Sequence, residues 1–397
     1  MSITISGIAD NSTHLSGNII EVKATTSGKP AGASEYRIML KIESTDNVLE
    51  GSPFFDAITP DANGLAIFDI SGLMDQHIQK DFYWPIPNAW GGRWHGYTNL
   101  VYDVRLTPGE LYIDENNLLV EKWGSLFGTI FIVKGKLDNY FLTKLQSQNL
   151  SWFDYFCAAG RWFTHQPLIQ YITPNQPVKL WWKPPQTGLS FALNAKAYYS
   201  DNSELVFSGS PTMWYDVMFE FDLQPDGLGF FPVINDAKLL YYEVWMTGSP
   251  NIEKRTFIID HRYQEETYFL LADNQIGGID CISLTGATEY SATGERNIAI
   301  KPFQKTMGVK HRTKLPTGIK RERQWKINSG YKSKQEMIAL EMLLHTPAAW
   351  LLVPPANGST NIADYTVVPV NITSTSLTLT NSLTDQESVE IEFTEAY

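Results

Sequence analysis

The sequence predicts a mainly β protein with serial immunoglobulin- or fibronectin-III-like β-sandwich modules, followed by a C-terminal β-rich domain with one short helix. Three observations predict this fold class. Apolar and polar residues mostly alternate with a period of two, clusters of Gly, Pro, Asn and Asp separate the short runs, and clear helix-start and helix-stop signals coincide in one segment. The chain of 397 residues is long enough for two or three such domains.

The first module is expected at residues 1–135. Its best strand pattern is 36–42, where Tyr36, Ile38, Leu40 and Ile42 alternate with polar or flexible residues. Turn residues at 27–32 and 60–64 separate strands, and Pro108-Gly109 is read as a turn. The expected strands are 20–24, 36–42, 65–70, 102–106, 111–113 and 128–133.

Residues 136–174 form an aromatic connector, in which 138–148 can form a short helix and 151–156 are too aromatic for a flexible linker. A second β-sandwich module is expected at 175–263, with strands near 193–199, 242–246 and 257–259. Both modules place a Pro/Asp turn before an apolar strand, so an internal duplication is a hypothesis.

The C-terminal β domain is expected at 264–397 and begins with a hairpin that turns at Gly277-Gly278. The helix 333–345 has Ser333 as N-cap and Glu336 three residues later, the pattern of a capping box, and Pro347 follows it. Three strands, 366–372, 376–380 and 388–394, are expected to close the chain.

Composition excludes several classes of protein. With 43% hydrophobic and 19% charged residues the chain can bury a core, so wholesale disorder is excluded. No apolar stretch approaches 18 residues, and the first residues carry neither a basic nor an apolar signal region, so we expect no membrane span and no export signal. Cys157 and Cys281 stand in unlike contexts, which predicts buried free thiols in a reducing cytoplasm.

The formal charge of -12 argues against general affinity for nucleic acid or an anionic membrane. One segment differs, because residues 301–326 contain nine Lys or Arg and a single acid, Glu322. Such a charge run is typical of a solvated hairpin, and it suggests self-association as readily as contact with nucleic acid.

We expect no catalytic, metal or cofactor site. Nucleotide-binding, metalloprotease and serine-hydrolase motifs are absent, and the seven histidines include no i, i+4 pair. Acid pairs such as Asp103 with Glu110, or Glu265 with Glu266, could in principle flank a glycosidic bond, but 43 acids produce such pairs by chance.

One loop is rich in flat rings. The candidate glycan-contact aromatics lie among Pro, Gly, Asn and His residues; they are Tyr83, Trp84, Trp90 and Trp94. Exposed rings with polar neighbours can stack on a sugar, whereas packing at the end of a sandwich or at a subunit interface is the alternative that we favour.

The C-terminal third resembles tail-tip and baseplate (distal-tail-like) structural proteins of tailed bacteriophages and prophages of Bacteroidetes-type hosts. The resemblance rests on Phe269 to Asp280, Trp325 to Gly330, the helix Gln335 to His345, and the ending Val367 to Phe393. It implies a non-enzymatic virion protein that is assembled in the host cytoplasm as a ring, with other tail proteins and possible host glycans as partners. A polysaccharide-binding or polysaccharide-degrading β protein, and a capsid or spike component, stay open as alternatives.

The charge asymmetry predicts where copies meet. A basic segment on an acidic chain lets one subunit contact the next head to tail, and such heterologous contacts can close into a ring. The residues expected at that interface are Lys310, Arg312, Lys320, Arg321 and Arg323. Contact with DNA is the competing interpretation of the same charges.

Overall fold

The computed structural model describes residues 3–44, 51–78, 94–97, 100–185, 189–211, 213–214, 217–231, 237–262, 266–300, 314–342, 346, 348–374 and 386–396. For residues 295–300, 314–321 and 386–387 it describes the backbone only. The chain forms two compact units. Unit 1 consists of Met1–Gln170, Pro177–Ile259 and Asp273–Asp280, and unit 2 of Tyr171–Gln176, Asp260–Ala272 and Cys281–Tyr397. Strands dominate both, which confirms the predicted mainly β fold class.

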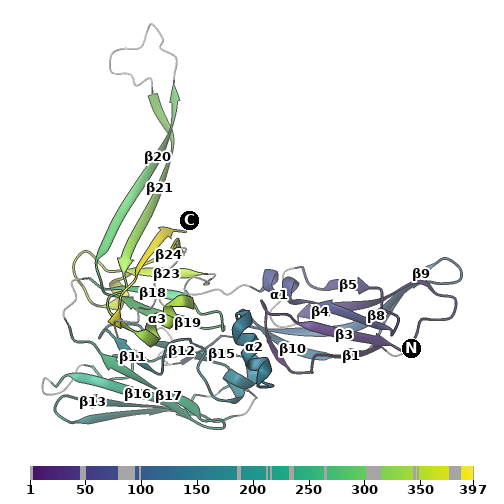
Figure 1. Cartoon of the computed structure of the whole chain (residues 1–397), viewed down its shortest axis with the longest axis horizontal. Helices are drawn as coiled ribbons and strands as arrows, with labels where there is room; N and C mark the ends of the chain where they lie inside the picture. The colour runs from purple at the N-terminus through teal and green to yellow at the C-terminus, as the bar shows by residue number, and fades with distance from the viewer. Residues whose placement is uncertain are drawn as a thin grey trace, which may run out of the picture. The chain divides into compact units, whose positions relative to one another are not determined.

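The first β-sandwich of unit 1 has the two-sheet arrangement expected of a fibronectin-III-like module (Figure 1). One sheet contains, in spatial order, β1 (Ile3–Ser6), β3 (Glu21–Thr26) and β6 (Leu65–Asp69). The other contains β2 (Thr13–Leu15), β10 (Gly128–Val133), β8 (Val101–Ile113), β4 (Ser34–Ser44) and β5 (Phe54–Ile58), with β9 (Leu119–Trp123) paired to β8. The core between them includes Val22, Leu40, Phe68, Val104 and Ile130, all fully buried.

Two features of this module differ from the sequence expectation. Pro108-Gly109 is not a turn, because β8 continues through both residues to Ile113. A proline fits extended backbone and removes one N–H donor, so the strand continues while the pairing beside it is disturbed. A short helix, α1 (Ser71–His77), was not predicted; it has no side-chain cap and buries Met74 alone, so its sequence carries little helical signal.

The rest of unit 1 contains two further sheets. The first has the order β11 (Ile169–Ile172), β17 (Ile252–Ile259), β16 (Leu239–Thr247), β13 (Ala192–Tyr199) and β14 (Glu204–Gly209). The second has the order β12 (Lys179–Trp182), β15 (Met218–Asp222) and β7 (Trp94–Tyr97). The expected helix appears as α2 (Asn139–Ser147), capped by Asp138, and Asp154–Ala158 form a π-helical turn. Residues 94–97, from the segment assigned by sequence to the first module, thus pair with a strand of the second.

Unit 2 is built on a seven-stranded sheet. Its order is β19 (Ile279–Leu284), β18 (Tyr268–Asp273), β23 (Ala349–Val353), β24 (Thr366–Ile372), β26 (Glu390–Glu395), β21 (Lys314–Asn328) and β20 (Thr288–Ile300). A second, two-stranded sheet joins β22 (Lys332–Ser333) and β25 (Gln386–Glu387). Ile327, Leu351 and Ile391 belong to a buried core with side chains of α3.

The predicted capping box is confirmed in α3 (Lys334–Glu341). The Ser333 hydroxyl accepts from the Glu336 backbone N–H, and the Glu336 carboxylate accepts from the Ser333 backbone N–H. The helix ends before Met342, and residues 343–345, in the predicted last turn, lie outside the described residues. The predicted strand 376–380 also lies outside them, whereas 366–372 is confirmed. No helix in the described ranges is long and apolar enough to span a bilayer.

Both cysteines are free thiols. Cys157 is buried as expected, and burial raises its pKa to about 12. Cys281 is half-buried, which departs from the expectation that both thiols are buried.

Candidate functional site

The most prominent feature of unit 2 is a long two-stranded ribbon. β20 and β21 pair antiparallel from Thr288 opposite Ile327 to Ile300 opposite Lys314. β26 pairs with β21 over Gln324–Asn328 only. Beyond that point, within the described chain, residues 314–323 have β20 as their one strand partner, and the ribbon extends away from the sheet of its unit (Figure 1). We call 292–300 and 314–323 the arm.

The described side chains at the start of the arm are not covered by a neighbouring element. Residues 291–294 are all exposed, although successive residues of a strand point to opposite faces. A two-stranded hairpin in water is only marginally stable on its own, and an unpaired strand edge is a template for another strand. The two arm strands, about 30 and 33 Å long at 3.3 Å per residue, therefore offer backbone donors and acceptors for a partner.

Three of the five predicted interface residues lie on this ribbon. Lys320 pairs with Glu295, Arg321 with Gly294, and Arg323 with Ala292, whereas Lys310 and Arg312 lie outside the described residues. Arg323 stands at the base of the arm, where its Nε lies 3.6 Å from Oε2 of Glu395.

The base of the ribbon is electrostatically compensated within unit 2. Lys326 Nζ lies 2.7 Å from Glu390 and 3.9 Å from Glu392, and hydrogen bonding to Glu390 raises the pKa of Lys326. Arg323 and Lys326 thus both have acidic neighbours in their own sheet. Lys320 and Arg321 lie farther from these acids along the strand.

The aromatic loop is described at one position only. Tyr83, Trp84 and Trp90 lie outside the described residues. Trp94 begins β7, pairs with Phe221 and packs on Gly209, where an added Cβ would come within 2.9 Å of the indole ring. Trp94 is half-buried, so its ring is partly occupied by packing.

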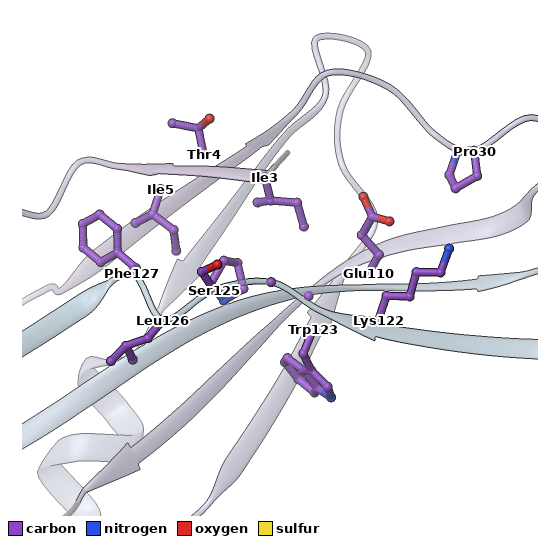
Figure 2. A pocket seen from close by; sticks show the side chains of 13 residues that line it. Ile3, Thr4, Ile5, Pro30, Glu110, Lys122, Trp123, Ser125, Leu126 and Phe127 are labelled. Carbon is purple, nitrogen blue, oxygen red and sulfur yellow. The ribbon is translucent and has the colours of Figure 1, made fainter. Parts of the chain in front are cut away.

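A groove opens on one flank of the first β-sandwich, with a cavity of about 710 Å³ (Figure 2). We call it the flank groove. One wall is β1, the other is the segment 122–127 that joins β9 to β10, and residues 108–110 of β8 also line it. It was not anticipated from sequence.

The flank groove arises from a break in strand pairing. β9 pairs with β8 up to Trp123 opposite Gly109, and β10 resumes with Gly128 opposite Leu106. Four residues, 124–127, therefore face the two residues 107–108, as in an enlarged β-bulge. The N–H of Gly124 donates to the Pro108 carbonyl (2.8 Å) and that of Phe127 to the Leu106 carbonyl (2.9 Å), while Pro108 itself has no N–H to offer.

A buried carboxylate lies in this groove. Glu110 is 6% exposed and accepts a hydrogen bond from the Tyr36 hydroxyl at 3.2 Å. Lys122 is its cross-strand neighbour. The Lys122 ammonium lies 5.6 Å from the Tyr112 ring centroid, and hydrogen bonding to Tyr112 together with the nearby Glu110 raises the pKa of Lys122. Glu110 is thus a nearly buried carboxyl group whose hydrogen-bond donor is the neutral Tyr36 hydroxyl, with the Lys122 ammonium as a nearby cation.

The opposite face of β9 carries an exposed aromatic pair. Trp123 is 37% and Phe55 is 61% exposed, and their ring centroids are 5.6 Å apart. The indole Nε1 donates to Glu121 at 2.6 Å, and the indole covers Gly109, where an added Cβ would come within 2.7 Å of it. Figure 2 shows Trp123 pointing away from the side on which Glu110 and Lys122 face β1. Sequence reasoning missed the pair because its members lie on separate strands.

One acid pair considered from sequence is too widely separated to flank a glycosidic bond. Asp103 and Glu110 are seven residues apart on the same strand, about 23 Å at 3.3 Å per residue, well beyond the separation needed at a glycosidic bond. Glu265 lies outside the described residues. In the described ranges no group of three or more His, Cys, Asp or Glu side chains is arranged to hold a metal ion.

Two titratable side chains with shifted pKa values lie in the interior of unit 1. Burial raises the pKa of Asp280 and lowers that of the neighbouring His165, and Asn274 donates to Asp280 at 3.4 Å. The Asn274 amide also donates to the Phe163 carbonyl and its Oδ1 accepts from the Gly278 N–H. Because Asp280 is buried and its partner Asn274 also forms hydrogen bonds with backbone groups, we interpret this cluster as structural.

Comparison with known proteins does not indicate a family or a function. No family description and no curated protein matches the sequence. Among solved structures, the crystal structure of Salmonella alpha-2-macroglobulin mutant Y1175G is matched over 99% of this chain and 23% of that chain, with 8% identity and a TM-score of 0.18. The chain therefore spans about a quarter of that protein, and a TM-score this low carries no argument about fold or function.

Proposed function

We propose that the protein is a non-enzymatic structural subunit that assembles with copies of itself into a ring within the tail tip or baseplate of a bacteriophage. The observation that carries the proposal is the arm. It has open edges, its described residues 292–294 are exposed, and a ribbon of this kind gains stability when a partner covers it.

Charge supports the same proposal. The segment 301–326, which includes residues 314–323 of β21, has nine Lys or Arg and one acid, whereas the whole chain has a formal charge of -12. Repulsion between acidic copies is reduced when the basic segment of one copy meets an acidic surface of the next. The tail setting rests on the similarity of the C-terminal third to tail-tip proteins.

The test is the association state of the full chain by light scattering and negative-stain microscopy. Reversal of Lys320, Arg321 and Arg323 to Glu should abolish ring formation, with only a modest loss of stability from the broken contact between Arg323 and Glu395. A matched control reverses three exposed lysines outside the arm, Lys144, Lys238 and Lys334, which produces the same change in net charge. Wild-type protein that stays monomeric at high concentration, or two variants that assemble equally well, would contradict the proposal.

DNA binding is examined with the same variants across a salt series. If assembly survived the arm reversal while DNA retention fell by about one counterion per lost charge, contact with nucleic acid would replace the assembly role.

Glycan contact is a second candidate function, favoured by the Trp123 and Phe55 pair. An exposed indole whose orientation is fixed by Glu121, on a flat strand face, can stack on a sugar ring. Trp123→Ala should remove binding to host polysaccharides in affinity electrophoresis, whereas Trp214→Ala, at another exposed indole, should not. Equal retention of wild type and Trp123→Ala would exclude this role.

A further inference from the structure

We propose that the flank groove of one copy receives the arm of a second copy, with the open edge of β21 added as a strand to β1. This inference rests on the proposed function and names the surface that the arm binds. The two elements lie in different units, and the contact is between different copies of the chain.

The groove presents open strand edges on both of its sides. β1 is the terminal strand of its sheet and pairs with β3 alone in the described chain. β9, on the other sheet, pairs with β8 alone. In each terminal strand the backbone N–H and C=O groups that point outward have no strand partner, so an extended segment between them can continue a sheet.

The dimensions of the two elements agree. The four residues of β1 span about 13 Å, and residues 314–323 of β21 offer an edge of about 33 Å. A strand added to β1 lies about 4.8 Å from it, in the space that the bulge at residues 124–127 keeps open. Ile3, Ile5 and Phe127 provide apolar walls for the side chains of such a strand.

Charge selects the basic arm as the occupant. Glu110 lines the groove almost fully buried, with a neutral hydroxyl as its hydrogen-bond donor. A lysine or arginine of the arm would add a charge-assisted hydrogen bond to this carboxylate. Residues 1–135 as a whole contain 16 Asp and Glu against nine Lys and Arg, so the long-range field also attracts the arm.

The contact is heterologous, because the arm and the groove are different surfaces of each copy. Each subunit would donate its arm to one neighbour and accept an arm from the other, which closes a ring when the rotation per subunit divides a full turn.

Disulfide trapping tests which segment occupies the groove. In a Cys281→Ser background, where the remaining Cys157 is buried and its pKa is raised to about 12, one preparation carries Ser125→Cys on the exposed bulge and another carries Lys320→Cys. When these two preparations are mixed and oxidised, the Ser125→Cys and Lys320→Cys variants should form a covalent dimer. Ser125→Cys mixed with Lys238→Cys, an exposed position outside the arm, should not.

Neutralising the buried carboxylate tests the chemistry of the contact. Glu110→Gln should weaken association about tenfold or more, as expected for loss of one charge-assisted hydrogen bond, with little change in melting temperature. Glu115→Gln neutralises an exposed acid of the same module and should leave association unchanged.

The outcomes separate this inference from the proposed function. If rings form and depend on the arm, but no Ser125→Cys to Lys320→Cys dimer appears and Glu110→Gln associates normally, the groove assignment is wrong and the assembly role stands. If the wild-type chain does not associate at all, both are wrong. A covalent dimer together with weaker association of Glu110→Gln supports both.

Discussion

The first β-sandwich and the arm use the same antiparallel pairing in opposite surroundings. β4 of the sandwich pairs on both sides, with β5 and β8, and residues 38, 40 and 42 are buried between the sheets. β20 of the arm pairs with β21 alone, and residues 291–294 are exposed on both faces.

The difference shows that ladder hydrogen bonds alone do not determine stability. A backbone hydrogen bond exchanged for water contributes only about 1 kcal/mol net, whereas a buried aliphatic or aromatic side chain contributes about 1.5–3 kcal/mol. The sandwich has both contributions, whereas residues 291–294 of β20 have mainly the first. We therefore expect the sandwich to be a rigid body and the arm to depend on a partner.

Hydrogen exchange should give the largest contrast. In dilute solution, the amides of β4 at Ile38–Ile42 should exchange at least a thousandfold more slowly than those of β20 at Ser291–Gly294, because the arm opens without unfolding a core. Mass spectrometry of peptides from the two strands measures this. Similar protection in both would show that the arm is stabilised within its own chain.

Truncation of a side chain should give the next largest contrast. Phe68→Ala, at a fully buried core position, should destabilise the sandwich by about 3–5 kcal/mol. Tyr290→Ala, whose 53% exposed ring lies 5.5 Å from that of Trp325, should cost about 1 kcal/mol or less. Denaturant titration of both variants checks the difference, and comparable losses would contradict it.

Acid should weaken the sandwich selectively. Burial lowers the pKa of His14 in β2 from 6.5 to about 4. Between those values the unfolded chain binds a proton that the folded module does not, so this contribution to stability is intact above pH 6.5 and is lost as the pH falls toward 4. We expect a loss of about 3 kcal/mol across this window. His14→Gln should flatten the pH dependence of the melting temperature, and an unchanged slope would refute this role of His14.

Removal of the capping box should have the smallest effect on stability. Ser333→Ala removes the hydroxyl that accepts a hydrogen bond from the Glu336 N–H, and it should destabilise unit 2 by about 1 kcal/mol. Ser291→Ala, at an exposed position beside the arm, should change stability by less than about 0.5 kcal/mol. Equal thermal shifts for the two variants would show that the cap is not stabilising.

Local sequence signals were sufficient to predict a helix or strand where one segment contains all the interacting residues. The capping box of Ser333 and Glu336 fixed the start of α3, and alternation over residues 36–42 and 366–372 identified β4 and β24. In each case the partners lie within four residues or repeat along one strand, so their chemistry is visible in the sequence. The predicted turn at Pro108-Gly109 was wrong because the dipeptide is a local turn signal, whereas pairing with the flanking strand keeps the backbone extended.

The sequence by itself determined the β class, the modular strands, the α3 cap and the concentration of positive charge in one segment. Only the tertiary structure decided that Glu110 is buried beside the open edge of β1, that Trp123 meets Phe55, and that β7 joins β15. Those contacts join residues from about 70 to more than 100 positions apart. Their formation depends on strand order and register, which arise from the packing of the whole core rather than from any local pattern.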